Sequence, residues 1–344
     1  MADSVQSKPI ISSDRAPGVL ADDVLDDAEA GAEVEWRQVN VPAASHGERL
    51  DRALAGIVPE FSRSYLQQLI AASAVELNGV AITKASARVK AGDALRIELK
   101  PTPQSQAFKP EAMALDVIFE DAHLLVINKP PGLVVHPAPG NWSGTLLNGL
   151  LARDPQAGLL PRAGIVHRLD KDTSGLMVVA RTRQAMDALV AMIAARSVSR
   201  EYLALAQGAW QGPASRQVDA PMGRDPRNRL RMAVVDLEKN AGKSASTGIA
   251  LLQNEGAFCL VKCKLQTGRT HQIRVHMASI GHPLVADEVY GGKPAAGLER
   301  QALHACRLAF AHPATGEALE FKSPLPADLA AAAASLGLRY NQKQ

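Results

Sequence analysis

Apolar residues recur at helical spacing in two short stretches near the start of the chain. Leu50, Ala53 and Leu54 fall on one face of a helix predicted over residues 46–55. A second helix is predicted to begin after Ser62, because a serine hydroxyl can accept a hydrogen bond from the first helical turn. The apolar face of this second helix comprises Tyr65, Leu66, Leu69 and Ile70.

The pattern changes to strands and tight turns after these helices. Residues 75–80 contain Asn78-Gly79, a dipeptide typical of a two-residue hairpin. A Lys-Ala-Gly-Asp turn then leads into residues 95–99, which alternate as a strand does. Two helices followed by a small hairpin sheet predict a compact unit over residues 36–100.

Short apolar stretches separated by proline- and glycine-rich turns dominate residues 112–326. An amphipathic helix is predicted over residues 184–196. Strands mixed with few helices are typical of the α+β class. The predicted strands are residues 124–127, 176–180, 202–206, 258–265 and 273–275.

Three further segments complete the predicted organisation. Residues 1–35 are acidic and contain no aromatic residue, which predicts a disordered tail. Residues 101–111 have the composition of a linker between the two folded units. The alanine-rich residues 327–344 are predicted to form a helical tail.

The net charge of +3 conceals an uneven distribution along the chain. Residues 1–35 hold nine acidic and two basic residues, a net charge of −7, so residues 36–344 carry +10. A basic body favours a polyanionic partner such as RNA, because lysine and arginine neutralise phosphates and release their counterions.

The sequence gives no indication of export, membrane insertion or a metal site. Three cysteines, no secretory leader and no apolar run of about 18 residues together predict a cytoplasmic location. Cys259 and Cys263 fall on the apolar face of a predicted strand, as core thiols do. His271 and His276 would point to opposite faces of a strand, so no set of metal ligands is predicted.

Two nucleotide-binding patterns fail on spacing. Residues 167–170, His-Arg-Leu-Asp, differ from a kinase catalytic loop because Leu169 stands between arginine and aspartate. The glycine-rich loop and the metal-binding asparagine that a kinase needs are also missing. The Gly-Lys-Ser at 242–244 resembles the end of a P-loop, but Leu237 takes the place of the required glycine.

Six segments of the second unit carry long motifs in a fixed order. They read NKPPGLVVHP at 128–137, GIVHRLDKDTSGL at 164–176, REYLA at 200–204, GRTHQIRVHM at 268–277, HPLVADEVYGG at 282–292 and RQALHA at 300–305. These motifs resemble those of the RluA-type pseudouridine synthases, and residues 36–100 resemble the S4 RNA-binding domain. The resemblance spans about residues 45–326. Ala286 departs from it, because close relatives usually carry glycine at that place.

The resemblance implies a fold, a reaction and a catalytic site. The fold is a mixed, largely antiparallel sheet of pseudouridine-synthase type behind a small S4 unit. The reaction isomerises specific uridines of 23S ribosomal RNA and needs no cofactor, because the base is detached, turned and rejoined without redox change. Asp170 is the implied nucleophile, Tyr202 stacks on the uracil, and Arg274 reaches Asp170 from a distant strand. A guanidinium there would favour the ionised carboxylate, which burial disfavours.

The resemblance also implies contacts with RNA. Arg168 would help to hold the target uridine outside its stack, but it could instead form an ion pair with Asp172. Asp172 suits a turn better than the second catalytic carboxylate of a glycosidase. The S4 arginines are matched to RNA contact, with a solvated basic surface as the alternative. The basic residues of 224–243 are predicted to form a mobile loop that grips RNA, with a solvated charge run as the alternative. The residues matched to RNA contact are Lys129, His136, His167, Arg168 and Arg269, with Arg49, Arg52, Arg63 and Arg88 in the S4 unit.

Three functions follow from these patterns. The first is a pseudouridine synthase acting on 23S ribosomal RNA, and the second is a synthase of the same family acting on transfer RNA. The third is a catalytically silent S4-type protein that binds RNA or assists ribosome assembly. The S4 unit favours ribosomal RNA, and the intact set of Asp170, Tyr202 and Arg274 favours an active enzyme. The expected partner is RNA, without DNA or membrane, and the expected state is a monomer.

Overall fold

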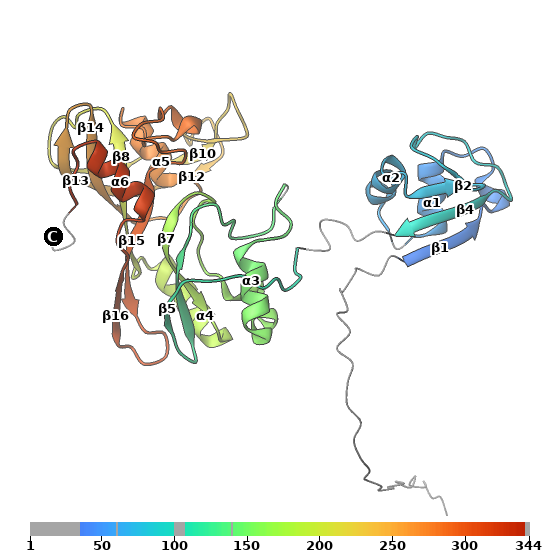
Figure 1. The fold of residues 1–344 in the computed structure, drawn as a ribbon, viewed down its shortest axis with the longest axis horizontal. Helices are drawn as coiled ribbons and strands as arrows, with labels where there is room; N and C mark the ends of the chain where they lie inside the picture. The colour runs from blue at the N-terminus through green and yellow to red at the C-terminus, as the bar shows by residue number, and fades with distance from the viewer. Residues whose placement is uncertain (1–34, 60, 100–106, 139, 341–344) are drawn as a thin grey trace, which may run out of the picture. The chain divides into compact units, whose positions relative to one another are not determined.

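The computed structural model describes residues 35–59, 61–99, 107–138 and 140–340. Residues 1–34 of the predicted acidic tail and most of the predicted linker lie outside the described residues, whereas Glu35 begins a strand. The chain divides into two compact units, Met1–Pro101 and Thr102–Gln344, and each is described by itself (Figure 1).

The first unit contains the two predicted helices and a small antiparallel sheet, but the sheet also includes a strand before the helices, β1 (Glu35–Asn40), that was not predicted from the sequence. Leu50, Leu54, Leu66 and Ile70 are fully buried between the helices and the sheet. The Ser62 hydroxyl accepts a hydrogen bond from the backbone N–H of the third residue of its helix, which caps that helix. The elements are β1 (Glu35–Asn40), η1 (Ala43–Ser45), α1 (Leu50–Ile57), α2 (Arg63–Ala71), β2 (Val75–Leu77), β3 (Val80–Ala81) and β4 (Ala94–Leu99), with sheet order β1-β4-β2-β3.

The second unit is built on one large mixed sheet. Its strands are β5 (Val117–Glu120), β6 (Leu124–Lys129), β7 (Ser174–Ala180), β8 (Ser199–Gln207), β9 (Ser215–Asp219), β13 (Ser246–Glu255), β14 (Phe258–Leu265), β15 (Leu303–Ala311) and β16 (Ala318–Lys322). Among the described residues the sheet has nine strands in the order β5-β6-β7-β15-β8-β14-β13-β9, with β16 beside β15. The pairing of β7 with β15 is parallel and the other pairings are antiparallel. The expected mixed, largely antiparallel α+β fold is therefore confirmed.

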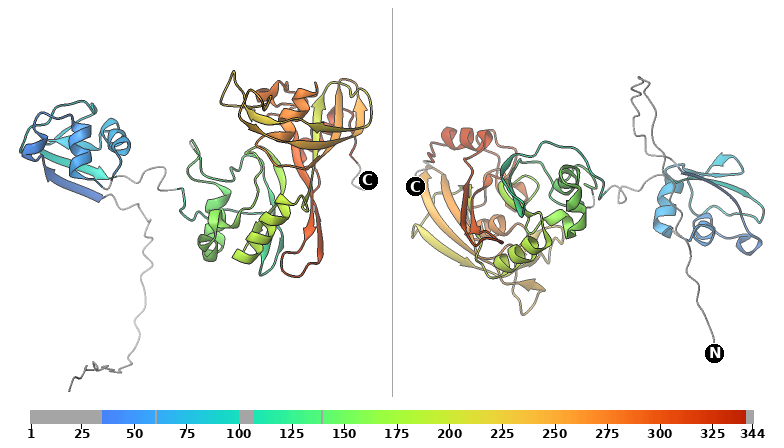
Figure 2. Two further views of the ribbon diagram at one scale, coloured as in Figure 1. Left: turned by 180° about the vertical axis from the view of Figure 1, so that it is seen from behind. Right: turned by 90° about the horizontal axis from the view of Figure 1, so that it is seen from below.

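Helices pack on the large sheet, and a second, smaller sheet packs against one of them, α5. The helices are α3 (Leu146–Arg153), α4 (Arg183–Ala194), α5 (Gln272–Ser279) and α6 (Ala327–Ser335), with short turns η3 (Pro155–Leu159), η4 (Pro161–Gly164) and η5 (Glu288–Tyr290). The strands of the small sheet are β10 (Met222–Arg224), β11 (Met232–Val234) and β12 (Gly242–Lys243). Figure 2 shows α4 and α6 beside different parts of the large sheet. No helix in the described ranges has the length and apolar character that a membrane crossing requires.

Alternation along the strands divides the core between the two faces of the large sheet. On β7, Met177 faces a cluster that includes α3 and α5, whereas Val178 faces a cluster with α4. On β8, Tyr202 faces the first cluster and Leu203 faces a third one with α6. Burying each large apolar side chain contributes about 1.5–3 kcal/mol, so both faces of the central strands stabilise the fold. The first face also carries the pocket described below.

One predicted strand, residues 273–275, is wrong, because these residues belong to helix α5. Ile273, Val275 and Met277 alternate with polar residues, which is the pattern of a half-buried strand. In the helix, Ile273 and Met277 lie one turn apart against the core of the large sheet, and Val275 packs against the small sheet. The helix is therefore buried on more than one side, and its apolar positions do not show a single stripe.

Gly175, at the start of β7, permits the close parallel pairing with β15. Its φ is +115°, and a Cβ there would lie 2.6 Å from the backbone nitrogen of Ala305 and still closer to the Ala305 carbonyl oxygen. We predict that Gly175→Ala lowers the free energy of unfolding by more than about 2 kcal/mol, because backbone strain and steric overlap add. Denaturant unfolding of the full chain measures this change.

Gly158→Ala is the matched control. Gly158 lies in η3, where a Cβ would make an ordinary contact of 3.8 Å with Leu151. We expect this variant to unfold within about 0.5 kcal/mol of the parent. Equal stability of the two alanine variants would show that the close approach at Gly175 is not a constraint.

Candidate active site

Asp170 stands on a turn that backbone and side-chain contacts hold in front of β7. The Val178 N–H donates to Nε2 of His167 at 3.1 Å, and the Thr173 N–H donates to the Asp170 carbonyl at 3.1 Å. Leu169 is buried between these two anchors. The Asp170 side chain, 16% exposed, lines a cavity of about 500 Å³. The turn thus presents one accessible carboxylate to a half-open cavity of nucleotide size.

Lys129 holds the same turn from the core side. Its Nζ donates to the carbonyl oxygens of Pro130, Leu133 and Lys171 at 2.8–2.9 Å. The side chain is fully buried, and burial lowers the pKa of its ammonium to about 8, against the opposing charge of Asp172. In this position Lys129 supports the turn and has no surface on which to contact RNA, contrary to its expected role.

Arg274 on α5 connects Asp170 to a second, buried carboxylate. Its Nη1 donates to Oδ2 of Asp170 at 3.3 Å, while Nε and Nη2 donate to the two oxygens of Asp287 at 2.7 and 2.8 Å. Burial alone would lower the pKa of Arg274, but the hydrogen bonds and charges of Asp287 and Asp170 raise it above its ordinary value. The planar guanidinium is therefore always charged and fixed in orientation.

Two aromatic residues complete the surroundings of this ion pair. Nε2 of His271 lies 3.8 Å from Oδ1 of Asp170, and its Nδ1 lies 2.8 Å from the hydroxyl of Tyr290. The ring of Tyr290 also stacks under the Arg274 guanidinium, 5.0 Å from ring centroid to Cζ. Burial lowers the pKa of His271, against the raising effect of Asp170. His271 thus stands beside both the carboxylate and the guanidinium.

Tyr202 and Arg200 form the floor of the cavity. They lie two residues apart on β8, so both side chains point to the same face of the sheet. Burial raises the pKa of Tyr202 to about 12, which keeps its hydroxyl protonated at neutral pH. Burial, together with the charge of Arg200, lowers the pKa of the neighbouring His167 to about 3, which keeps that imidazole neutral. The floor therefore combines a neutral aromatic ring with one buried cation.

The mouth of the cavity is lined by more exposed basic residues. Arg168 is exposed there, and the described chain shows no ion pair between it and Asp172. Arg269 is anchored by its Nε to the carbonyl of Ser244 at 3.1 Å. His136 also lines the cavity, and burial lowers its pKa to about 4, with Arg168 as the next cause.

Three of the four predicted arginines of the S4 unit pair with carboxylates, and the fourth donates to a backbone carbonyl. Arg49 and Arg63 both donate to the buried carboxylate of Asp51 at 2.8–3.3 Å. Arg52 pairs with Glu48 at 3.4 Å, and Arg88 donates to the carbonyl of Gly47 at 2.6 Å. All four side chains stay largely exposed, so they form a fixed basic surface.

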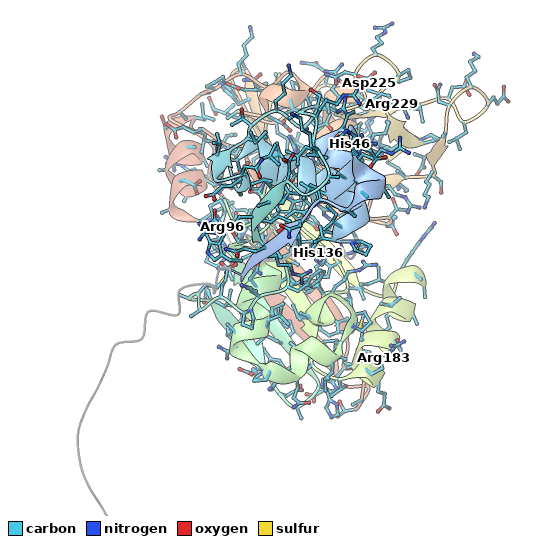
Figure 3. The ribbon with its side chains drawn as sticks, turned by 90° about the vertical axis from the view of Figure 1, so that its right-hand side faces the viewer. His46, Arg96, His136, Arg183, Asp225 and Arg229 are labelled. Carbon is cyan, nitrogen blue, oxygen red and sulfur yellow. The ribbon has the colours of Figure 1, made fainter. Side chains whose placement is uncertain are left out.

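The basic segment 224–243 is more ordered than a simple loop. It contributes to the three short strands β10, β11 and β12, and Asp225 pairs with Arg231 at 2.7 Å. Arg229 lies in the connection between β10 and β11 (Figure 3). The Met232 N–H donates to the Tyr290 hydroxyl at 3.1 Å, which connects this small sheet to the active-site cluster.

The site also contains residues for which the sequence indicated no role. Asp287, His271, Tyr290 and Arg200 all lie within the motifs quoted above, but a motif does not show which side chains meet. Ala286 precedes Asp287 and adopts φ 58°, a left-handed conformation that glycine adopts without strain. The described residues contain no group of three or more potential metal ligands.

Comparisons with known proteins agree with this architecture. A model of the RNA pseudouridylate synthase family matches residues 123–279, and a model of the S4 domain matches residues 48–95. Ribosomal large subunit pseudouridine synthase D of Neisseria meningitidis is 46% identical over 321 residues, which cover 89% of this chain and 84% of the relative. The protein of the same name from Nitrosomonas europaea is 47% identical over 302 residues, 86% of each chain. The solved structure of human RNA Pseudouridylate Synthase Domain Containing 4 has a TM-score of 0.52 and 25% identity, and it covers 65% of this chain and 94% of that one.

The fold and these similarities define an RNA-modifying enzyme, a pseudouridine synthase with an S4 domain. More narrowly, the chain belongs to the RluA-type family of RNA pseudouridine synthases.

Asp287 tests the organisation of the ion-pair cluster. Asp287→Asn leaves Arg274 with Asp170 as its one carboxylate partner in place of two, so it should lower the free energy of unfolding by about 3 kcal/mol. Turnover should also fall, because Arg274 loses the bidentate contact that orients it toward Asp170. Denaturant unfolding and a pseudouridine assay on the same preparation measure both effects.

Asp187→Asn provides the matched control. Asp187 pairs with Arg183 at 3.0 Å on the surface of α4, with both side chains more than 60% exposed. Arg183 is labelled in Figure 3. Such a pair contributes about 0.5 kcal/mol or less. A loss at Asp287 no larger than the loss at Asp187 would contradict the buried cluster.

Proposed function

We propose that this enzyme converts specific uridines of 23S ribosomal RNA to pseudouridine with the Asp170 carboxylate as nucleophile. The supporting observation is the 3.3 Å contact, inside the cavity, between Arg274 and Asp170, which are 104 positions apart in sequence. The names of the relatives point to the ribosomal large subunit as the substrate. The S4 unit, with its exposed arginines, supports an RNA substrate of the same kind.

A single ionised carboxylate is sufficient for the chemistry. Asp170 can attack C1′ of the ribose or C6 of the uracil, and either attack loosens the base so that it can turn and rejoin through C5. Arg274 keeps a positive charge 3.3 Å from Asp170, where it forms an ion pair with the nucleophilic carboxylate. Because Arg274 is held by Asp287 on its other edge, it need not reorganise when the substrate enters.

Tyr202 is suited to hold the base. Its buried ring lies on the cavity floor, where it can stack on the uracil plane. With a pKa raised to about 12, its hydroxyl acts as a neutral hydrogen-bonding group beside the C5 proton that must leave. Because the hydroxyl is protonated at neutral pH, Tyr202 cannot act as the base that removes the C5 proton.

The cavity mouth is suited to an extruded nucleotide. A uridine in folded RNA has to leave its stack before a recessed carboxylate can reach it. The exposed, unpaired Arg168 beside Asp170 can occupy the vacated space or clamp a flanking phosphate. Leu169 and the apolar wall around it limit the access of water, so the detached base rejoins and is not hydrolysed.

Tritium release from RNA tests both the nucleophile and the substrate. Pseudouridine formation replaces the C5–H bond of uridine with the new glycosidic bond, so [5-³H]uridine loses its label to water. We expect release from 23S ribosomal RNA and little from transfer RNA. Asp170→Asn should lower the rate by more than about 10⁴-fold, because the nucleophile is lost while the fold is kept.

Asp172→Asn controls for the change of charge on the same turn. Its carboxylate makes no hydrogen bond in the described chain, so the rate should stay within about threefold of the parent. Release from Asp170→Asn equal to that of the parent would remove Asp170 from the mechanism. Tritium release from transfer RNA alone would refute the proposal that 23S ribosomal RNA is the substrate. It would not affect the proposal that Asp170 is the nucleophile.

A further inference from the structure

Arg200 is a buried cation without a partner. Only 6% of the residue is exposed, and its Nε is buried with no hydrogen bond. The described chain offers the guanidinium no hydrogen bond or ion pair, in contrast to Arg274 with its two carboxylates. An uncompensated buried charge costs several kcal/mol, so a position of this kind is maintained where a ligand supplies the missing contacts.

The guanidinium is built into the floor of the cavity. Arg200 lies two residues before Tyr202 on β8, and both side chains line the same cavity as Asp170. A Cβ on residue 268 would lie 2.9 Å from Nη1 of Arg200, so Gly268 leaves the room that the guanidinium occupies. The adjacent His167 stays neutral and does not satisfy the charge. Arg200 therefore presents its free hydrogen-bond donors to the part of the cavity in which Tyr202 would stack on the base.

The depth of Arg200 distinguishes it from the other basic residues of the cavity. Arg162, Arg168 and Arg196 line the same cavity but are exposed at its mouth, where the RNA backbone must pass. Phosphates remain on the outside of an extruded nucleotide, whereas the base enters first. A recessed cation beside the tyrosine is therefore placed for the edge of the pyrimidine and not for its phosphate.

We propose that Arg200 binds a carbonyl oxygen of the extruded uracil and stabilises the negative charge that the base acquires during the reaction. This inference rests on the proposed function. Cleavage of the N1–C1′ bond leaves its electron pair on the uracil, shared with O2 and O4. Addition of the carboxylate to C6 instead moves the C5=C6 electron pair toward C5 and O4. Both routes place developing charge on a pyrimidine oxygen, where a fixed guanidinium lowers the barrier.

Single-turnover tritium release separates this role from backbone binding. The substrate is [5-³H]uridine-labelled 23S ribosomal RNA or transfer RNA, whichever the parent modifies. Arg200→Met should lower the rate at saturating enzyme by about 10²–10³-fold, as loss of an oxyanion donor does. The enzyme concentration that gives the half-maximal rate should stay within about threefold of the parent.

Two further variants make the test specific. Arg200→Lys keeps the positive charge but not the planar guanidinium, so its rate should lie between those of the parent and Arg200→Met. If Arg200→Met does not fold, the rate of Arg200→Lys is compared with that of the parent instead. Arg196→Met removes a cation from the mouth and should raise the half-maximal concentration with little change in the saturated rate.

Two results would overturn the proposal. An Arg200→Met enzyme with the parental saturated rate and weakened RNA binding would assign Arg200 to a phosphate. Parental values of both quantities would make Arg200 a structural residue. Failure of the parent itself to release tritium from either RNA would instead refute the proposed function, and the role of Arg200 would fall with it.

Discussion

One guanidinium, shared between two carboxylates, organises the active site. Arg274 uses Nε and Nη2 for Asp287 and keeps Nη1 for Asp170, so one planar group fixes the direction of both contacts. A lysine ammonium could not form this two-sided fork. The arrangement is costly to bury, and it persists because every charged edge of Arg274 has a partner or an aromatic face.

The fold brings these groups together from separate segments. The turn before β7 presents Asp170, α5 presents Arg274, the turn before η5 presents Asp287, and β8 provides the floor with Tyr202. Lys129 secures the Asp170 turn from within the core, and Gly175 lets β7 approach β15 closely. The site thus stands on one face of a rigid sheet, where stacking, charge and nucleophile can be preorganised for one extruded base.

Much of this organisation could be predicted from the sequence, and the remainder depends on contacts that sequence does not encode locally. Strands β6, β7, β8 and β14 follow from short apolar runs between turns, and Asp170, Tyr202 and Arg274 follow from the motifs that contain them. Helix α5 was unpredictable by periodicity, because it is buried on more than one side. Lys129 and Arg168 are both basic residues of a motif, but Lys129 is buried and Arg168 is exposed. The motifs do not show this difference in burial. The ion pair of Asp287 with Arg274 and the lack of a hydrogen-bond partner for Arg200 Nε arise only when distant segments pack.

A double-mutant cycle on the free energy of unfolding tests the central pairing most directly. Arg274→Met leaves two carboxylates without their shared cation, one of them fully buried, and should strongly destabilise the full chain. Adding Asp287→Asn to that variant should restore stability, with a coupling of at least about 2 kcal/mol between the two substitutions. Additive effects, within about 0.5 kcal/mol, would contradict the account that Arg274 and Asp287 form one charged unit.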